Sequence, residues 1–416
     1  MTVELISVGT ELLLGNIVNT NSNYLSKKCA ELGYSLYYQV TVGDNEERLS
    51  DAVTTALSRS DVIILTGGLG PTQDDMTKEA VAKVLKRDLV MDEISKNHIE
   101  TYFAYRSCNG TVPSVITSNN WKQALKIVGS TAVDNENGTA PGYIIEVDSK
   151  IIILLPGPPF EMIPMFQKSI YPFLKSKQSK IFLSKMVKIC GIGESKAETE
   201  ILDLIEKQTN PTIAPYAKSG EVHFRITASA DTEQEAMMLI QPVIDELYRR
   251  FGNNIYTIEE EETLEAVVVK LLLQKKYSLA TAESCTGGLL TGCLVNVPGV
   301  SDVLQEGIIT YSNEAKIKYL GVKPETLHTF GAVSPQTAEE MVRGVAKAAN
   351  SSTALAITGV AGPDGGSPEK PVGTVYTACY VNGEVIIKKN HFNGTRQKVR
   401  EQSVIQALDM LRRNLL

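Results

Sequence analysis

Short apolar runs that end in glycine recur along the 416-residue chain and alternate with helix-like segments. VELISV ends at Gly9 and DVIILT ends at Gly67. Helical patterns over about residues 21–32 and 46–59 lie between these runs, and SLYYQVTV indicates a further strand between the two helices. Strands that alternate with helices pair in parallel, because each helix carries the chain back across the sheet. The pattern therefore predicts a parallel α/β sheet with helices on both faces.

The pattern changes twice further along the chain. YIIEVDSKIIILL indicates a pair of strands in a hairpin, and a small α+β module of strands, a turn and amphipathic helices begins near residue 181. The glutamates of residues 259–262 suit the first turn of a helix that opens a last α/β unit, with strands expected at YSLATA, GIITYS, TALAITG and TVYTACYV. We expect three domains, at residues 1–172, 173–256 and 257–416.

Charge and cysteine content narrow the class of protein. The net charge of −7 argues against a dedicated nucleic-acid binder, since phosphate backbones select basic surfaces. The six cysteines are dispersed and form no Cys/His cluster, which indicates reduced thiols rather than a zinc site or disulfides. They are Cys29, Cys108, Cys190, Cys285, Cys293 and Cys379. We find no signal peptide and no membrane-spanning run, and therefore expect a cytoplasmic protein without a direct nucleic-acid or membrane partner.

A nucleophile is expected where YSLATA runs into ESCTGG. Ser284 follows a predicted strand and precedes a helix, a position at which free backbone N–H groups can hold a developing oxyanion. Gly287 and Gly288 let a ligand approach the backbone closely. Serine needs a base, and neither His328 nor His391 lies in a recognisable catalytic motif.

Lys316 and Tyr311 follow the next predicted strand and offer such a base. Burial can bring the pKa of a lysine toward neutrality, because it disfavours the charged amine, and Tyr311 can relay or orient the proton. On spacing alone, a surface lysine and a tyrosine at the edge of the core are the simpler interpretation. Cys285 is a rival nucleophile, since thiolates attack amides well.

Another glycine loop in this region follows TALAITG. Thr358 lies where that predicted strand ends, and the glycines after it, among them Gly359 and Gly362, form an N–H-rich rim suited to a phosphate. Arg396 and Arg400 share one face of a predicted helix start and also suit a phosphate. A solvated helix face explains these two arginines equally well.

The segments AESCTGG, TYSNEAK, GAVSPQTAEEM, ITGVAGPDGG and KPVGTVY together resemble the C-terminal domain of the CinA family. That family contains nicotinamide mononucleotide deamidases, so the resemblance implies an α/β amidohydrolase domain that needs no cofactor. It implies a dyad of Ser284 and Lys316, assisted by Tyr311 and Thr358. It also implies substrate contacts at Glu283, Thr286, Gly287, Gly288, Gly359, Gly362, Arg396 and Arg400, with either arginine as the phosphate ligand.

Two loops near the N-terminus predict a second site. GTELLLGNIVNTN follows the first strand and TGGLGPTQDD follows the third, so both loops should meet at one sheet edge. The loops offer polar side chains, a glycine cradle and paired acids: Glu11, Asn16, Asn19, Asn21, Gly67, Gly68, Gly70, Asp74 and Asp75. Paired aspartates beside a glycine cradle suit a divalent cation that bridges phosphates. Helix capping by Asp74 or Asp75 explains one aspartate but not the glycines.

These loops and LLPGPPFEM resemble the molybdopterin-binding-like α/β domain at the N-terminus of the CinA family. The resemblance implies metal-dependent ADP-ribose pyrophosphatase activity with Mg²⁺, Mn²⁺ or Co²⁺, and with K⁺ as a further candidate ion. It adds Thr72, Pro156 and Gly157 to the expected site. A molybdopterin carrier, or an accessory protein of DNA uptake and recombination, is the alternative function.

The middle module resembles the KH-like α+β insert of the same family. Gly191-Ile192-Gly193-Glu194 has the wrong spacing for the GXXG loop with which KH domains clamp nucleic acid, and it carries an acid. The module is therefore predicted to be a spacer or a dimerisation element. A homodimer is expected from the family resemblance.

Overall fold

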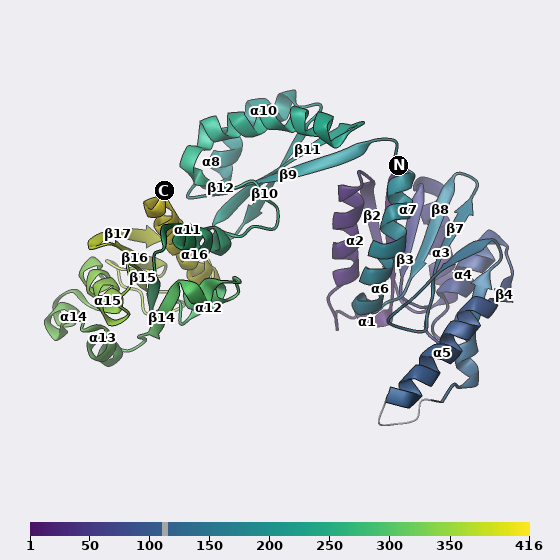
Figure 1. Ribbon diagram of the computed structural model, residues 1–416, viewed down its shortest axis with the longest axis horizontal. Helices are drawn as coiled ribbons and strands as arrows, with labels where there is room; N and C mark the ends of the chain where they lie inside the picture. The colour runs from purple at the N-terminus through teal and green to yellow at the C-terminus, as the bar shows by residue number, and fades with distance from the viewer. Residues whose placement is uncertain (110–114) are drawn as a thin grey trace. The chain divides into compact units, whose positions relative to one another are not determined.

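The computed structural model describes residues 1–109 and 115–416, without the side chains of residues 106–109. The thiol of Cys108 thus lies outside the described residues, and the other five cysteines are free thiols. The described chain forms two compact units (Figure 1). One unit comprises Met1–Phe182 with Ser229–Glu233, and the other comprises Leu183–Ala228 with Gln234–Leu416. We describe each unit by itself.

The first unit is built on a six-stranded sheet with the strand order β2-β1-β3-β8-β7-β6. The strands are β1 (Thr2–Val8), β2 (Ser35–Val42), β3 (Val62–Thr66), β6 (Ser130–Val133), β7 (Gly142–Val147) and β8 (Lys150–Leu155). Strands β2, β1, β3 and β8 run parallel, whereas β7 pairs antiparallel with β8 and with β6. The predicted parallel sheet is confirmed for four strands, and the predicted hairpin is β7–β8.

The remaining elements of this unit connect or cover the sheet. The helices are α1 (Thr10–Leu13), α2 (Thr20–Glu31), α3 (Glu46–Arg59), α4 (Thr77–Leu85), α5 (Glu93–Asn109), α6 (Pro159–Met165) and α7 (Tyr171–Ser176). Shorter elements are β4 (Leu89–Met91), β5 (Leu125–Ile127), η1 (Ser118–Ala124) and η2 (Phe166–Ile170).

Helices cover both faces of the six-stranded sheet. Successive side chains of a strand point to opposite faces, so each central strand contributes to two hydrophobic cores. Ile63 of β3 packs in one core with Leu49 of α3. Ile64 packs in a second core with Leu25 of α2. All five residues of β3 are buried, as expected for a central strand between two helical layers.

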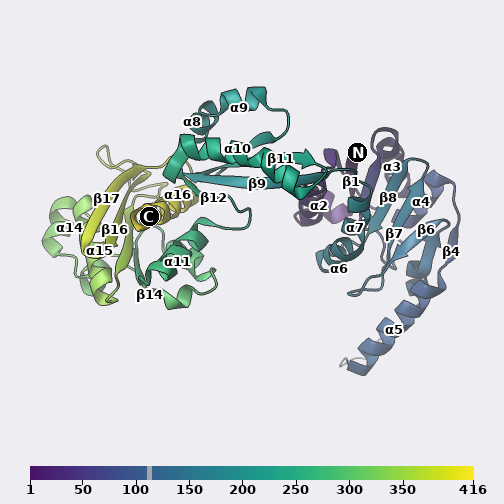
Figure 2. The same cartoon turned by 45° about the horizontal axis from the view of Figure 1, so that its top comes forward.

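The second unit contains two sheets. The KH-like sheet has the order β10-β11-β9-β12, and the C-terminal sheet has the order β14-β13-β15-β16-β17. In the C-terminal sheet β13 runs parallel to β14 and β15, whereas β16 and β17 are antiparallel additions. Helix α10 lies along the KH-like sheet in both views (Figure 1 and Figure 2). The arrangement is a mixed α/β fold, as predicted.

The elements of the second unit have these bounds. The strands are β9 (Ile181–Cys190), β10 (Thr212–Lys218), β11 (Glu221–Ala230), β12 (Ile255–Thr257), β13 (Leu279–Glu283), β14 (Leu304–Ile309), β15 (Thr353–Gly359), β16 (Thr374–Val381) and β17 (Glu384–His391). The helices of the KH-like module are α8 (Glu194–Thr199), α9 (Leu202–Lys207), α10 (Glu233–Phe251) and η3 (Gly252–Asn254). The C-terminal helices are α11 (Leu264–Lys275), α12 (Leu289–Val295), η4 (Val300–Asp302), α13 (Asn313–Leu320), α14 (Pro324–Phe330), α15 (Pro335–Ala348) and α16 (Arg396–Leu415).

The sequence prediction is wrong at three places in this unit. The acidic run 259–262 precedes α11, whose N-cap is Thr263. The backbone carbonyls of Glu260 and Glu262 instead accept hydrogen bonds from Lys188 Nζ, at 2.6 and 2.8 Å. Strand β14 ends at Ile309, so the last part of GIITYS is a loop. Strand β17 was not predicted, since its exposed lysines interrupt the apolar pattern.

Helix α16 joins the KH-like module to the C-terminal sheet. Arg412 of α16 donates to the carbonyl of Asn253, and Arg413 donates to the carbonyl of Cys190 at 3.2 Å. Asp409 accepts hydrogen bonds from both arginines at 2.7 Å and is buried. This buried ionic network explains why the two sheets belong to one compact unit. Among the helices of the described chain, none is both long and apolar enough to cross a membrane.

Candidate functional site

The C-terminal candidate site begins at Ser284, directly after β13. The N–H of Ser284 donates to the carbonyl of Ile357 on β15 at 3.0 Å, which ties the loop to the neighbouring strand. Gly287 and Gly288 have φ values of 58° and 92°, a left-handed region that glycine adopts without strain. The two glycines therefore form the turn between Ser284 and α12.

Glu283 holds this turn in place. Its carboxylate accepts hydrogen bonds from the N–H groups of Gly288, Leu290 and Thr291 at 3.0, 3.1 and 2.8 Å, and from the Thr291 hydroxyl at 2.7 Å. The side chain is fully buried. Both oxygens are thus used in capping α12, and the expected substrate contact of Glu283 is replaced by this structural role.

Lys316 meets Ser284 inside the domain. Its Nζ lies 3.1 Å from Ser284 Oγ and donates to the carbonyl of Thr310 at 2.7 Å. Only 1% of Lys316 is exposed, so the interpretation as a surface lysine does not apply. Burial lowers the pKa of Lys316 below its ordinary value, because the charged amine loses its hydration. A neutral amine can keep one N–H on Thr310 and accept the proton of Ser284.

Cys285 is less suited to be the nucleophile. Its thiol is buried, and burial raises the pKa of Cys285 to about 11. A thiol with such a pKa is protonated at neutral pH, and the protonated form is a weak nucleophile. The backbone of Cys285 has a different use. Within the described residues, the N–H groups of Cys285 and Thr286 donate to no backbone carbonyl, which makes them the candidates for stabilising an oxyanion.

The two arginines of α16 reach the loops around Ser284. Arg396 donates to the carbonyl of Gly362 at 2.6 Å and to the hydroxyl of Tyr311 at 2.9 Å. Arg400 donates to the carbonyl of Thr286 at 2.6 Å. Two cations thus lie on the loops that surround the serine, as a phosphate-bearing substrate requires.

Tyr311 and Thr358 do not touch the dyad. Tyr311 is held by Arg396, and 64% of it is exposed. The hydroxyl of buried Thr358 donates to the carbonyl of Ala332 at 2.7 Å. In the described part of the chain neither hydroxyl bonds to Ser284 or Lys316. Both residues border the loops of the site, and their expected assistance of the dyad stays a prediction.

The glycines after β15 have structural roles. A Cβ on Gly359 would lie 2.6 Å from a methyl carbon of Val375 and 2.8 Å from the carbonyl oxygen of Thr374. This glycine therefore lets β15 pack against β16. Gly362 presents its carbonyl to Arg396, which links the loop to α16.

A cavity of about 900 Å³ forms the N-terminal candidate site. It lies at the carboxyl ends of β1, β3 and β8, where the first and third loops meet as predicted. The predicted residues that line it are Glu11, Asn19, Asn21, Gly67, Gly68, Gly70, Asp74, Asp75, Pro156 and Gly157. Asn16 and Thr72 do not line it, and their expected place in the site stays a prediction. The N–H of Asn16 donates to the carbonyl of Glu11, and the N–H of Thr72 donates to the carboxylate of Asp75.

The glycines of this cavity are required by close approach. Gly67 has a φ of 98°, and a Cβ there would lie 2.3 Å from the carbonyl oxygen of Val8. A Cβ on Gly68 would lie 2.2 Å from the hydroxyl of Thr77. Gly157 accepts a hydrogen bond from Asn21 Nδ2 at 2.6 Å. These contacts hold together three segments: the loop after β3, the loop after β8 and the start of α2.

The paired aspartates do not cap α4. Its N-cap is Met76, with no side-chain hydrogen bond. Asp75 instead closes its own loop through Thr72, and the Thr72 hydroxyl lowers the pKa of the exposed Asp74. Within the described residues no three acidic, histidine or cysteine side chains gather as a metal cluster. Two carboxylates beside a phosphate cradle still fit Mg²⁺, which commonly binds through one or two carboxylates and the phosphates of its substrate.

Sequence reasoning missed residues that line this cavity and a residue that holds one of its loops. Lys122 Nζ donates to the carbonyls of Thr72, at 3.0 Å, and of Asp75, and so clamps the aspartate loop. Phe160 and Glu161 also line the cavity, although they belong to the LPGPPFEM segment that carries the resemblance. Burial raises the pKa of Glu161. The sequence motif thus contained a signal for Glu161. It contained none for Lys122, whose role depends on a loop far away in the sequence.

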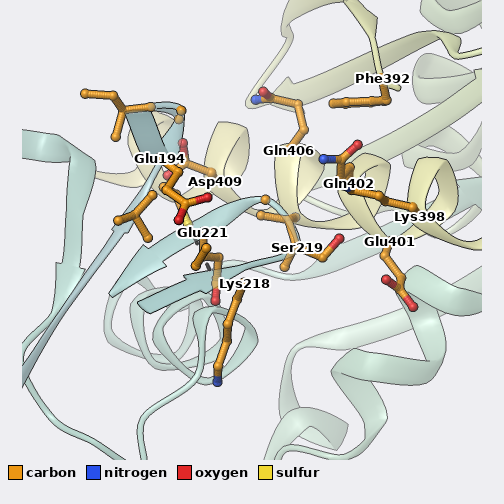
Figure 3. A pocket seen from close by; sticks show the side chains of 18 of the residues that line it. Glu194, Lys218, Ser219, Glu221, Phe392, Lys398, Glu401, Gln402, Gln406 and Asp409 are labelled. Carbon is orange, nitrogen blue, oxygen red and sulfur yellow. Dashed lines mark hydrogen bonds between the residues drawn. The ribbon is translucent and has the colours of Figure 1, made fainter. Parts of the chain in front are cut away.

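A further cavity of about 740 Å³ lies between the KH-like module and α16. Figure 3 shows side chains of the β10–β11 turn and of α16 around it. The loop Gly191–Glu194 forms part of its wall. Ser284 and Lys316 do not line this cavity, so it is separate from the C-terminal candidate site.

Family models match almost the whole chain. The CinA C-terminal domain matches residues 261–415, a probable molybdopterin binding domain matches residues 4–176, and the KH domain of the damage-inducible protein CinA matches residues 184–257. A relative from Clostridium beijerinckii, named as a competence-damage inducible protein, is 52% identical over 416 residues, with all of both chains covered. The chain belongs to the CinA family.

Two further proteins are similar to this chain. A CinA-like protein of Dictyoglomus thermophilum is 50% identical over 416 residues and covers 100% of each chain. A crystal structure of the competence/damage inducible protein CihA from Agrobacterium tumefaciens shares 41% identity, with a TM-score of 0.35. The match covers 36% of this chain and 94% of that chain.

The glycine loop of the CinA KH domain is largely exposed. Residues 191–194 face α16 across the cavity of Figure 3. A Cβ on Gly191 would lie 3.0 Å from the guanidinium of Arg413. Gly191 thus approaches α16 closely, and the expectation that the loop clamps no nucleic acid stays a prediction.

Proposed function

We propose that the C-terminal domain hydrolyses the amide of nicotinamide mononucleotide to nicotinate mononucleotide and ammonia. The observation that carries this proposal is the buried contact of 3.1 Å between Lys316 Nζ and Ser284 Oγ. A serine becomes an effective nucleophile only beside a base, and a lysine becomes a base only when its pKa is lowered. Both conditions meet at this contact.

In the proposed reaction Ser284 Oγ attacks the amide carbon and Lys316 takes the hydroxyl proton. The carbonyl electrons move to oxygen, where the N–H groups of Cys285 and Thr286 stabilise the negative charge. When the tetrahedral intermediate collapses, the C–N bond breaks and Lys316 returns the proton to the departing nitrogen. Water then cleaves the acyl-serine ester with the same amine as its base, which releases the nicotinate carboxylate. No step needs a cofactor.

Arg396 and Arg400 support the choice of a nucleotide amide. Both guanidinium groups donate to neutral oxygens of the loops around Ser284. A phosphate is a stronger acceptor for a guanidinium than a carbonyl or a phenol is. We expect one arginine to exchange such a partner for the phosphate of the substrate.

Ammonia release tests this proposal. The purified chain is incubated with nicotinamide mononucleotide, and ammonia is measured with a coupled enzyme assay. We expect release by the wild-type chain and none by Ser284→Ala. A wild-type chain that releases no ammonia would remove the proposal and favour the non-enzymatic alternative.

We further propose that the N-terminal cavity hydrolyses ADP-ribose to AMP and ribose 5-phosphate. The specific support is the glycine cradle beside Asp74 and Asp75 in one cavity. Asp74 and Asp75 would hold a divalent cation, which activates water and neutralises phosphate charge when bound. The chain's own glycine N–H groups would bind the diphosphate. AMP release from ADP-ribose with Mg²⁺, Mn²⁺ or Co²⁺, each with and without K⁺, is the test.

A molybdopterin-binding or recombination-accessory role is the alternative to both activities. It would be favoured if neither ammonia nor AMP is released. A homodimer and a cytoplasmic location remain predictions. Light scattering of the purified chain and fractionation of cells test them directly.

A further inference from the structure

One wall of the N-terminal cavity combines aromatic rings with a carboxylate. Phe160 and Glu161 lie at the start of α6, Tyr102 lies on α5, and all three line the cavity. The hydroxyl of Tyr102 donates to the carbonyl of Asn137 at 3.4 Å, and Asn137 Nδ2 donates to the carbonyl of Phe160 at 2.9 Å. These bonds join the segments into one surface. We call Tyr102, Phe160 and Glu161 the aromatic wall.

The carboxylate of Glu161 is fixed in this wall. Asn135 Nδ2 donates to Glu161 Oε2 at 2.6 Å and to the carbonyl of Ala140 at 2.9 Å. Only 2% of Asn135 is exposed. A Cβ on Gly138 would lie 2.3 Å from Glu161 Oε2, so the glycine leaves room for the carboxylate. The position of the carboxylate is thus set by the loop between β6 and β7 as well as by its own helix.

Glu161 has no cationic partner among the described residues, and its Oε1 accepts no hydrogen bond from them. A partly buried carboxylate without a cation is costly, because the single hydrogen bond from Asn135 replaces only part of its lost hydration. Such groups concentrate at functional sites. The carboxylate can accept hydrogen bonds but cannot donate them, so it favours a ligand that presents an N–H group.

Phe160 indicates the shape of that ligand. It is 63% exposed although it is large and apolar, so its ring is open to a stacking partner. Flat heterocycles stack on such rings, and proteins read their edges by hydrogen bonds. A flat ring with an exocyclic amino group, as in adenine, fits both the ring of Phe160 and the acceptor of Glu161.

We infer that the aromatic wall binds the adenine ring of a nucleotide, with Phe160 stacking on the ring and Glu161 accepting a hydrogen bond from its amino group. This inference rests on the proposed nucleotide-hydrolysing function of the same cavity. It also predicts that the site selects adenine over hypoxanthine. Hypoxanthine carries a carbonyl oxygen where adenine carries the amino group, and that oxygen would face the acceptor Glu161.

Binding of AMP and IMP tests the inference. Both are titrated into the full-length chain by calorimetry, and the ratio of their dissociation constants is compared between variants. We expect AMP to bind at least about tenfold more tightly than IMP to the wild-type chain, since a hydrogen bond to a charged group discriminates by roughly this factor or more. In Glu161→Gln the ratio should fall close to one, because an amide can also donate to the hypoxanthine carbonyl.

Two further variants sharpen the test. Glu136→Gln removes a carboxylate of the same loop region whose side chain is 64% exposed and pairs with Lys168 outside the cavity, and it should keep the wild-type ratio. Phe160→Ala removes an exposed ring and should leave the fold intact. It should weaken AMP and IMP alike, roughly 5- to 100-fold, since stacking tolerates any base.

The outcomes separate this inference from the hydrolase proposal, because AMP and IMP contain no pyrophosphate. Equal affinities for AMP and IMP in the wild-type chain, or binding of neither, would overturn the inference. A Glu161→Gln chain that keeps the AMP preference but releases AMP from ADP-ribose more slowly would also overturn it and would assign Glu161 to the chemistry. A chain that prefers AMP over IMP but does not cleave ADP-ribose would support the adenine site and refute the hydrolase proposal.

Discussion

Replacing Lys316 by methionine separates catalysis from stability in the C-terminal domain. Methionine fills most of the same space but has no amine to accept the proton of Ser284. A positioned general base contributes about 10²- to 10⁴-fold to a rate, so Lys316→Met should lower deamidation by that factor.

The stability of Lys316→Met should change little, because two terms oppose each other. The folded chain holds the Lys316 proton more weakly than the unfolded chain does, since burial lowers the pKa. At pH values below its folded pKa the lysine therefore destabilises the fold, by about 1.4 kcal/mol for each unit of lowering. This cost shrinks as the pH rises from the folded pKa to the unfolded pKa of about 10.4, and it is absent above that pH. Removing the amine relieves this cost but leaves the carbonyl of Thr310 without its donor, which costs about 1–3 kcal/mol.

The assay compares ammonia release and thermal unfolding of wild type, Lys316→Met and the control Lys318→Met. Lys318 lies on the same helix and is exposed, so its variant should keep the wild-type rate. The wild-type rate should rise with pH as Lys316 loses its proton, at a pH below the ordinary lysine value of about 10.4. The argument is refuted if Lys316→Met keeps more than a tenth of the rate at an unchanged melting temperature.

Three further predictions concern single residues. Cys285→Ala should keep most of the ammonia release that Ser284→Ala abolishes; the opposite pattern would assign the attack to the thiol. Gly67→Ala should destabilise the fold by about 2 kcal/mol or more, because its Cβ would meet the carbonyl oxygen of Val8. The control Gly15→Ala has open space around it and should cost about 1 kcal/mol for its positive φ alone. Denaturant unfolding of both variants measures the difference. Asp74→Asn should raise the Mg²⁺ concentration needed for half-maximal AMP release by about tenfold, because one carboxylate ligand is lost, and an unchanged metal requirement would place the ion elsewhere.

Much of the framework could be predicted because it depends on local pattern. Short apolar runs placed β1, β3 and β13, and strand-to-glycine junctions placed Ser284 and the N-terminal crevice. The boundary errors differ in cause. The carbonyls of the acidic run 259–262 accept hydrogen bonds from Lys188, which is far away in the sequence, whereas the carbonyl of Thr310 after β14 accepts one from the nearby Lys316.

The sequence predicted many of the residues at the candidate sites, but it did not predict what each residue does there. Glu283 lies within the motif, but only the fold shows that its carboxylate caps α12. Lys122 lies in no motif, and only the fold brings it to the loop of Asp75. The bonds of Glu283 are local but require the turn at Gly287 and Gly288, and the bonds of Lys122 reach a distant loop. Neither arrangement leaves a periodic trace in a sequence, so neither role could be predicted.

The sequence by itself determined the family, the order of strands and helices, and the positions of the serine and the glycine loops, because each depends on residues close together in the chain. The tertiary structure alone decided that Lys316 is buried beside Ser284, 32 residues away, rather than exposed on a helix. Whether an amine keeps its proton depends on how much water the surrounding elements exclude. That exclusion is a property of the packed domain and not of any segment within it.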